Sequence, residues 1–489
     1  MHPSPDPRLR AGHPLPQGER ERHPLSCPPP QNRAEAAATL PLAAKSFSAL
    51  PGPKMVDQLR VGIAGLGVVG AAAVRLLQRQ ADALHARTGR RIVVTAGAVR
   101  DRRKERGVDL SSLRIFDDPV ALARSPDIDL FVELMGGDEG AARASVEAAL
   151  EAGRHVVTAN KALLAKHGLA LAELAEEKHV ALAFEASVAG GIPIVKTLRE
   201  GLAGNSIERV YGILNGTCNY ILSRMEREEL SFDECLKEAQ RLGYAEADPS
   251  FDIGGFDTAH KLAILTSLAF GTSIDADAIH VEGIEGVTLA DINAAEDLGF
   301  RIKLLGVAQR TRNGIEQRVH PTMVHKSSAL AEVMGVTNAV TIDADAVHEL
   351  TLVGPGAGGE ATASAVVADI ADIAKGIRSP PFGLPVARLQ KSEKLAMQRH
   401  EGGYYIRFSA IDQPGTIAAI AKRMAERQIS LESVMQKSAP NATAKRGGPV
   451  PVVLITYATT EELVRSAVDA IVADGTVAEK PQVIRIERQ

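Results

Sequence analysis

Cysteine, tryptophan and long apolar runs are scarce or absent in this sequence of 489 residues. Its three cysteines, Cys27, Cys218 and Cys235, are too few and too scattered for a disulfide framework or a zinc knuckle. No apolar run reaches the roughly 18 residues that a membrane-spanning helix needs. The net charge of -4 gives no electrostatic reason to expect a nucleic-acid partner. These absences favour a globular enzyme in a reducing, cytoplasmic setting.

The first 54 residues differ in composition from the rest of the chain. They are rich in proline, with arginine and histidine and few bulky apolar residues, so they bury too little surface to fold. Prolines also make the segment a poor signal peptide. We expect residues 1–54 to be a disordered leader, and Met55, just before the first expected strand, to be the physiological start.

From Leu59 onward, strand-like and helical patterns alternate. This alternation predicts an α/β fold with a parallel sheet covered by helices on both faces. The expected strands are 60–64, 92–99, 128–134 and 155–158, and the expected helices are 71–84, 141–152 and one starting at Lys161.

The pattern changes near Phe184 and again after a proline-rich stretch at 380–385. We expect an α+β substrate-binding and dimerisation domain over 185–354, with a turn at 215–219. A helix at about 355–378 returns to the first domain, which spans 55–184. A linker over 379–402 leads to a small α+β unit over 403–489, expected to be separate from the enzyme core.

A glycine turn joins the first strand to the first helix. It reads Gly65-Leu66-Gly67-Val68-Val69-Gly70, the G-x-G-x-x-G spacing of Rossmann-type dinucleotide sites. The glycines allow a tight turn, close approach of a pyrophosphate and close helix packing, while the helix N-terminus favours phosphate. A tight strand–helix turn without a ligand is the alternative.

The end of the second strand bears on the choice of cofactor. Val99 is followed by Arg100-Asp101-Arg102-Arg103-Lys104. An acid here suits the ribose 2′-hydroxyl of NAD, whereas arginine suits the 2′-phosphate of NADP. Arg100 therefore favours NADP, Asp101 keeps NAD open, and a solvated charged loop remains the alternative.

The segment from Gly243 to Lys261 combines acids, turn residues and one lysine. Pro249 and the Gly254-Gly255 pair argue against a regular helix before that point. Asp257 and Lys261 follow at i and i+4, on one helix face. Such a group suits a small zwitterion, but an ordinary surface ion pair is equally compatible with the pattern.

Together these motifs resemble those of homoserine dehydrogenases, from about Leu59 to the C-terminus. The resemblance rests on the glycine turn and on Thr158–Lys161, Glu185–Gly191, Ile213–Tyr220 and the spacing of residues 239–261. The C-terminal unit resembles an ACT domain. With no aspartate-kinase domain before the dehydrogenase, the chain resembles the monofunctional, ACT-bearing type.

The resemblance implies reduction of L-aspartate 4-semialdehyde to L-homoserine with NAD(P)H, in threonine, methionine and isoleucine biosynthesis. It implies Lys261 as proton donor and Lys161 as a second lysine, beside substrate and cofactor, and which of them moves the proton stays open. The acids implied to bind the substrate's amino group are Glu246, Asp252 and Asp257, and the other substrate-lining positions are Gly216, Thr217 and Tyr244. Cys218 has no evident histidine partner, so we interpret it as a packing residue.

Further implications concern ions, regulation and assembly. Glu185, with the carbonyls of Val188, Gly190 and Ile192, resembles a monovalent-cation site for Na⁺, against the alternative of a plain glycine turn. The ACT resemblance implies threonine as an allosteric ligand, near Asp412 and Gly415, and a homodimer or homotetramer. The competing hypotheses are another amino-acid-pathway dehydrogenase and a non-catalytic amino-acid sensor.

Overall fold

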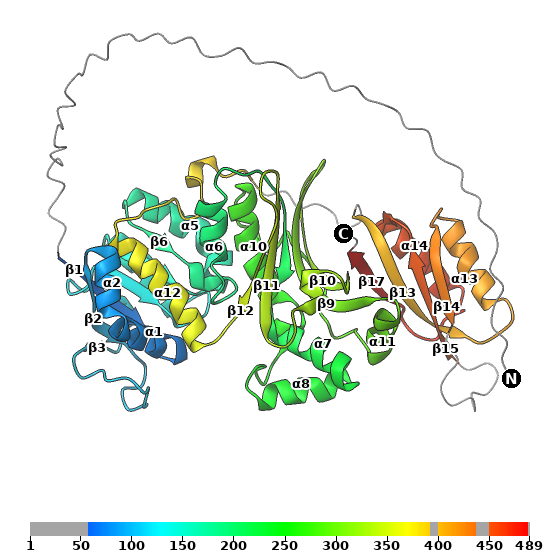
Figure 1. Ribbon diagram of the computed structural model, residues 1–489, viewed down its shortest axis with the longest axis horizontal. Coiled ribbons are helices and arrows are strands. Elements are labelled where there is room, and N and C mark those ends of the chain that lie inside the picture. The colour runs from blue at the N-terminus through cyan, green and yellow to red at the C-terminus, as the bar shows by residue number, and fades with distance from the viewer. Residues whose placement is uncertain (1–56, 392–399, 437–448, 488–489) are drawn as a thin grey trace, which may run out of the picture. The chain divides into compact units, whose positions relative to one another are not determined.

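Two β-sheets organise the described residues, 57–391, 400–436 and 449–487, of this computed structural model (Figure 1). The expected leader and Met55 as the physiological start lie outside these ranges. Within them, no helix is long and apolar enough to cross a bilayer.

The first sheet has six parallel strands in the order β3-β2-β1-β4-β5-β6. This is the Rossmann order, so the predicted parallel fold is confirmed. Its strands are β1 Gln58–Ala64, β2 Arg91–Ala98, β3 Arg114–Phe116, β4 Leu130–Glu133, β5 His155–Thr158 and β6 Leu182–Ala183.

Helices connect these strands and cover the sheet. They are α1 Val68–Arg79, α2 Ala81–Thr88, α3 Pro119–Ala123, α4 Ala141–Glu151 and α5 Lys161–Glu177. The single helix expected over 71–84 is wrong, because Gln80 leaves helical geometry and separates α1 from α2. No glycine or proline signals that break. A late helix, α12 Gly359–Ala374, returns to pack against α1 (Figure 1).

The second sheet has eleven strands in the order β12-β11-β7-β9-β10-β17-β13-β15-β14 along its main path. Off that path, β8 pairs with β10 and β16 with β13. The strands from the middle of the chain are β7 Ile207–Ile213, β8 His280–Val281, β9 Phe300–Thr311, β10 Gly314–His325, β11 Thr337–Ala344 and β12 His348–Pro355.

Short helical elements lead into this sheet and longer ones pack beside it. They are η1 Glu185–Ser187, α6 Ile194–Lys196, η2 Thr197–Gly201, α7 Gly216–Glu228, α8 Phe232–Arg241, α9 Ser250–Ile253, α10 Phe256–Phe270, α11 Leu289–Asp297, η3 Ala329–Glu332 and η4 Val386–Arg388. The turn expected at 215–219 is wrong: the Asn215 side chain accepts a hydrogen bond from Cys218 N and caps α7, which begins at once. A single helical turn, α9, also forms between Pro249 and Gly254.

The C-terminal unit contains β13 Glu401–Ile411, α13 Thr416–Ala425, β14 Leu431–Gln436, β15 Pro449–Thr456, β16 Thr459–Thr460, α14 Glu461–Ala473 and β17 Gln482–Glu487. Leaving aside the two-residue β16, this is a βαββαβ chain order with the strand sequence β17-β13-β15-β14. Tyr404, Ile406 and Phe408 of β13 pack towards its two helices.

That unit is not separate from the enzyme core, so this expectation is wrong. β17 pairs in parallel with β10 from Thr322↔Arg485 to Val324↔Glu487, which makes one continuous sheet. Tyr405 and Ile484 join the main hydrophobic core. The pairing satisfies the backbone groups of both strands, which an open sheet edge would leave without partners in the protein.

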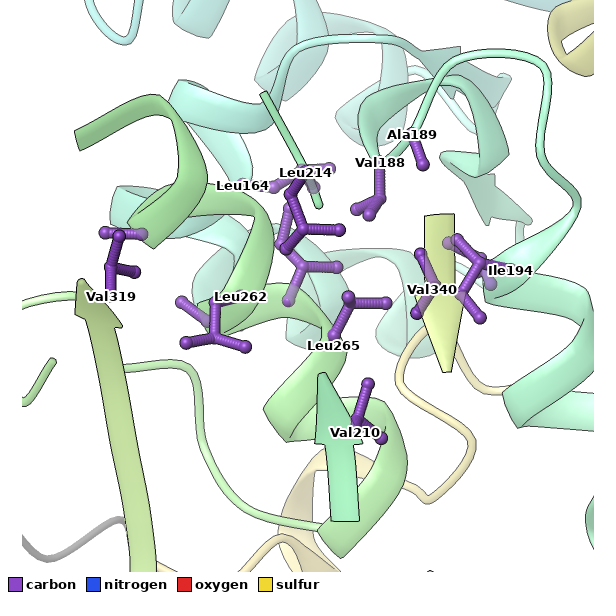
Figure 2. Packing of buried hydrophobic residues seen from close by; sticks show 14 of the residues in the cluster. Leu164, Val188, Ala189, Ile194, Val210, Leu214, Leu262, Leu265, Val319 and Val340 are labelled. Atoms are coloured by element: carbon purple, nitrogen blue, oxygen red, sulfur yellow. The ribbon is translucent and has the colours of Figure 1, made fainter. Parts of the chain in front are cut away.

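Helix α10 lies at the centre of that main core, where the two sheets' elements meet. It packs against α5 of the first sheet and against β7, β9 and β10 of the second. Figure 2 shows Leu262 and Leu265 of α10 among Leu164 of α5, Val188 and Leu214. All five are fully buried, with at most 1% of their surface exposed. This packing sets the position of the polar residues at the start of α10.

Candidate active site

The glycine turn between β1 and α1 is shaped by close backbone contacts at two of its three glycines. Gly65 has a φ of 93°, and a Cβ there would lie 2.5 Å from the carbonyl oxygen of Leu134. A Cβ at Gly70 would lie 2.1 Å from the carbonyl oxygen of Gly65. A Cβ at Gly67 would meet nothing within 4 Å. Internal packing thus explains Gly65 and Gly70, but Gly67 is better explained by the approach of a ligand.

A cavity of about 610 Å³ opens beside this turn, at the carboxyl ends of the parallel strands. Its lining includes Leu66 and Gly67 from the turn, whereas Val68, Val69 and Gly70 form the first turn of α1 behind it. The full lining is Gly65, Leu66, Gly67, Ala98, Val99, Arg100, Asp101, Lys104, Arg106, Asp117, Pro119, Leu134, Met135, Gly136, Glu139, Ala141 and Ala142.

One part of this cavity is basic. Arg100, Lys104 and Arg106 line it, whereas Arg102 is paired with Asp117 at 2.8 Å. Asp101 also lines it, but its carboxylate accepts a hydrogen bond from Arg103 N at 2.8 Å, within its own loop. Sequence reasoning named the cluster up to Lys104 and missed Arg106, two residues farther on. The cavity can therefore accept an anionic group beside Arg100.

A buried carboxylate that sequence reasoning missed organises the other side of the cavity. Glu133 ends β4 with no exposed surface. Its Oε1 accepts hydrogen bonds from Met135 N at 2.7 Å and Gly136 N at 3.1 Å, and its Oε2 accepts one from Thr158 Oγ1 at 2.7 Å. These bonds tie the cavity loop to the end of β5.

The same network places Lys161. The Asn160 side chain accepts a hydrogen bond from Leu163 N at 3.1 Å, which caps α5, and donates one to Gly137 O at 2.6 Å. Asn160 N donates to Thr158 Oγ1 at 3.0 Å. Lys161 therefore begins α5 at a fixed position, between the cavity loop and α10.

Asp257 joins the two lysines predicted from the sequence. Its Oδ2 lies 2.7 Å from Lys261 Nζ, and its Oδ1 lies 3.2 Å from Lys161 Nζ. Asn215 Nδ2 donates a third contact to Oδ2 at 2.8 Å. Lys261 Nζ also donates to Leu214 O at 2.7 Å. The structure thus brings Lys161, Asp257 and Lys261 together from two different sheets' helices.

The charge state of Asp257 follows from these neighbours. Burial, with 4% of the residue exposed, would by itself raise its pKa. The charges of Lys261 and Lys161, with hydrogen bonds from Lys261 and Asn215, outweigh burial and hold the pKa of Asp257 well below its usual range. Asp257 is therefore a permanent counter-charge for both lysines.

Asp252 lies next to this group but in a different electrostatic setting. Its Oδ1 accepts a hydrogen bond from Asn215 Nδ2 at 2.9 Å, and its Oδ2 one from Thr217 Oγ1 at 3.3 Å. Burial and the nearby charge of Asp257 raise the pKa of Asp252. An added cation here, such as an ammonium group, would offset both effects. Asn215, which bridges both acids, was named in the sequence only as part of a turn.

Three further residues predicted to line the substrate site have no described side-chain contact with Asp257 or the two lysines. Gly216 is tightly enclosed, since a Cβ would lie 2.8 Å from Val336 O. Tyr244 is 44% exposed and packs edge-on against Tyr220, with ring centroids 5.0 Å apart. Glu246 is exposed, and its only described contact is its main-chain oxygen, which accepts from Gln240 at 3.0 Å. The structure brings Asp252 and Thr217 to the lysines, but not the Glu246 carboxylate.

Cys218 lies beside this group without the features of a nucleophile. It is completely buried, and burial raises the pKa of its thiol well above the usual value. Its Sγ lies 3.2 Å from Asp252 O.

Glu185 occupies a buried acidic position at η1. Its two oxygens accept hydrogen bonds from Val195 N and Lys196 N, each at 2.9 Å. Burial and the charge of Asp369 raise the pKa of Glu185 to about 7. Lys196 Nζ contacts Asp369 at 3.2 Å and Asp372 at 2.6 Å, and Lys375 Nζ contacts Asp372 at 3.0 Å. The adjacent turn holds Gly190 at a φ of 53°, where a Cβ would lie 2.4 Å from Gly356 O.

Residues of both sheets match families of known proteins. Residues 65–185 match the family profile described as homoserine dehydrogenase, NAD binding domain, and residues 193–371 match the one described as homoserine dehydrogenase. The homoserine dehydrogenase of Neisseria gonorrhoeae is 44% identical over 88% of this chain and 98% of its own length. That of Pseudomonas aeruginosa is 44% identical over 88% of this chain and 99% of its own.

Solved structures agree with these matches. A homoserine dehydrogenase from Thiobacillus denitrificans is 43% identical, covers 88% of this chain and 98% of its own, and superposes with a TM-score of 0.82. A hyperthermophilic archaeal homoserine dehydrogenase in complex with NADPH is 27% identical, covers 65% of this chain and 98% of its own, and gives a TM-score of 0.57.

The empty space around Gly67 leads to a test of the ligand explanation. We expect Gly67→Ala to leave the melting temperature within about 1 °C while weakening dinucleotide binding at least tenfold, about 1.4 kcal/mol. Binding is measured by the fluorescence of titrated NADPH. Gly204→Ala is the control, because its Cβ would also meet nothing within 4 Å. Unchanged affinity in Gly67→Ala would contradict the assignment.

Proposed function

The chain belongs to the homoserine dehydrogenase family, and from that membership we propose how its residues divide the work of the reaction. The enzyme is an oxidoreductase of amino-acid biosynthesis that interconverts L-homoserine and L-aspartate 4-semialdehyde with a nicotinamide dinucleotide. The observation that carries the assignment of roles is the contact of Asp257 with both Lys261 and Lys161.

We assign the nucleotide to residues 55–184 with the return helix near 355–378, and the substrate to residues 185–354. Residues 379–402 are the linker and 403–489 the regulatory unit. When bound, the nicotinamide supplies the hydride for the aldehyde carbon. The cavity beside Gly65, Leu66 and Gly67 would hold the dinucleotide, and the start of α1, formed by Val68, Val69 and Gly70, would favour its phosphate groups.

Lys261 is the residue that meets the reacting oxygen. An ammonium has three N–H donors. Two of these are used by Asp257 and Leu214, so one remains. As hydride reaches the carbon, the carbonyl electron pair moves to oxygen, and the remaining N–H stabilises that charge and delivers the proton. The contact with Asp257 holds Lys261 in position for this step.

Lys161 is more open to the cleft than Lys261. Its side chain is 36% exposed, against 11% for Lys261. It follows the loop that lines the nucleotide cavity, so it is suited to hold substrate and nicotinamide in register. Its contact with Asp257 aligns it with Lys261.

The amino group of the substrate is assigned to Asp252, whereas Glu246, which the family resemblance also implies, is exposed and has no described side-chain contact with this group. Asp252 lacks a described cationic partner within ion-pair distance and has a raised pKa, so an ammonium group would stabilise its charged form. Asp257, by contrast, already faces two lysines, which makes it an orienting residue. Thr217, Gly216 and Tyr244 form the adjacent wall.

The basic part of the cavity favours NADP as the cofactor, with NAD also accepted. Arg100, Lys104 and Arg106 lie where the ribose 2′-phosphate of a Rossmann-bound nucleotide is expected. Asp101, which would select the free 2′-hydroxyl, accepts a hydrogen bond from its own loop.

A monovalent cation such as Na⁺ is proposed at Glu185, with the carbonyls of Val188, Gly190 and Ile192. Burial raises the pKa of both Glu185 and Asp369, so a further positive charge beside them would stabilise their charged forms. Sodium chloride should then raise the melting temperature more than tetramethylammonium chloride at equal ionic strength.

The C-terminal unit is proposed to be an ACT-like sensor of threonine. Its βαββαβ order supports this, as does the loop from Asp412 to Gly415, where Gly415 has a φ of 97°. We also propose a cytoplasmic homodimer or homotetramer. Light scattering gives the assembly directly, and cell fractionation the location.

Lys261→Ala should lower kcat by at least about 100-fold, the usual contribution of a positioned acid, with the KM for NADPH nearly unchanged. The control is Lys326→Ala, which removes a surface ion pair with Glu296. A loss of kcat below about tenfold, 1.4 kcal/mol, would refute the role of Lys261.

Arg100→Ala should raise the KM for NADP about tenfold or more, because a charge-assisted hydrogen bond to phosphate is worth about 1.5–3 kcal/mol. The KM for NAD should change less than about twofold. Arg103→Ala, from the same loop but outside the cavity lining, is the control. Equal changes for both cofactors would contradict the NADP assignment.

Saturating L-threonine should inhibit homoserine oxidation by the wild-type chain, while L-valine, which matches its shape but lacks the hydroxyl, should not. Initial rates with each amino acid provide the measurement. If threonine leaves the rate unchanged, the assigned ligand of the C-terminal unit is wrong.

A further inference from the structure

The segment Val281–Ile284 lies directly against the turn that leads into α10. Ile284 N donates a hydrogen bond to Ile253 O at 2.8 Å. A Cβ at Gly283 would lie 2.4 Å from Ile253 O and 2.7 Å from Gly254 Cα. A Cβ at Gly255 would lie 3.1 Å from Val281 Cγ1. The two segments therefore fit together with no spare space between them.

This turn carries the residues that the proposed function uses. Asp252 comes directly before it, Asp257 stands two residues after it, and Lys261 follows one helical turn later. A displacement of residues 253–255 would move both acids relative to Lys161, which belongs to another sheet. Reaction geometry tolerates little displacement, since about 1 Å can cost about 100-fold in rate.

Glu282, in the middle of the supporting segment, is held by the last strand of the chain. Arg485 Nη1 donates to Glu282 Oε2 at 2.6 Å, and Arg485 Nη2 donates to Oε1 at 3.0 Å. Such two-pronged pairs fix orientation as well as position. Arg485 also donates to Glu461 of α14, with Nη2 to Oε1 at 2.6 Å and Nε to Oε2 at 3.1 Å.

The charges in this group balance, and two of the charged side chains are out of contact with water. The side chains of Arg485 and Glu461 are 2% and 1% exposed. Arg465 of α14 adds a second cation, 2.6 Å from Glu282 Oε1. His280 lies 2.9 Å from Glu282. Burial would raise the pKa of Glu282, but hydrogen bonds from His280 and Arg485, with the charge of Arg485, hold it well below its usual range.

We propose that Glu282 is a positioning residue for the reaction. Arg485 of the C-terminal unit, by binding Glu282, holds the turn at residues 253–255 in place. The connection runs from Arg485 to Glu282, then through the close contact of Gly283 with Ile253 and Gly254, to Asp252 and Asp257. It rests on the proposed roles of Asp257 and Lys261. Strand β17 thus contributes to the geometry of the active site through Arg485, and this contribution requires no bound effector.

A second ion pair between the same two parts of the chain provides a matched control. Arg407 of β13 contacts Asp291 of α11 at 2.6 and 3.0 Å, and Tyr405 donates to the same carboxylate at 3.0 Å. None of the described hydrogen bonds links Asp291 to residues 253–255.

Steady-state kinetics of three variants test the ion-pair part of the connection. Glu282→Ala should lower kcat at least tenfold, with the KM for NADPH within about twofold and partial rescue by Glu282→Gln. Arg485 keeps Glu461 as a partner, so the change leaves no buried charge alone. Arg407→Met should keep kcat within about twofold, and melting curves correct each rate for the folded fraction.

A double-mutant cycle tests whether Arg485 acts through Glu282. Arg485→Lys keeps the positive charge but loses the two-pronged hydrogen bonding of the guanidinium to Glu282. We expect it to lower kcat, and Glu282→Ala combined with Arg485→Lys to lower it no further than Glu282→Ala alone. Fully additive losses would overturn the connection.

Two glycines in one loop test the steric part. Gly283→Ala should push on Ile253 and Gly254 and lower kcat at least tenfold. Gly286→Ala is the control, because its Cβ would come closest to the flexible end of the Gln482 side chain, at 2.9 Å.

Equal kcat in Gly283→Ala and wild type, or in Glu282→Ala and wild type, overturns the proposal. Equal losses in Glu282→Ala and Arg407→Met overturn it too. A wild-type chain without homoserine oxidation would instead refute the proposed function.

Discussion

The buried carboxylate of Asp257 is the constraint on which the arrangement of this enzyme depends. A charged group with 4% exposure is stable only when cations and donors surround it, and here Lys261, Lys161 and Asn215 do so. These partners come from α10, α5 and the start of α7. One carboxylate therefore requires the helices of two sheets to meet at a fixed distance.

The apolar core beneath Asp257 makes this meeting possible. Leu262 and Leu265 of α10 pack with Leu164 of α5 and Leu214 (Figure 2), and the main-chain oxygen of Leu214 accepts a hydrogen bond from Lys261. Dense packing allows little relative movement. The cavity beside the glycine turn and the acids Asp252 and Asp257 thus keep a fixed relative position, as the proposed hydride transfer between two bound molecules requires.

The C-terminal unit is also held in a fixed position relative to the rest of the enzyme. Pairing of β17 with β10 makes the strands of this unit continuous with the rest of the second sheet, and two groups of ion pairs, around Glu282 and Asp291, join the same parts. A ligand that altered the C-terminal unit would act on a rigid connection and would not need a long flexible path. The proposed regulatory unit and the proposed substrate site are in this way joined through one sheet.

The sequence alone determined the parallel Rossmann domain, the glycine turn and the i, i+4 placement of Asp257 and Lys261, because these depend on local periodicity and close spacing. Its motifs also resembled those of the family to which the chain belongs. Only the tertiary structure decided that Asp257 faces Lys161 as well, that Asn215 bridges two acids, that Glu133 holds the cavity loop and that Glu246 stands apart. The tertiary structure also decided that β17 pairs with β10 within the second sheet. These contacts join residues far apart in the chain, and no local pattern specifies which distant partner satisfies a buried charge or an open strand edge.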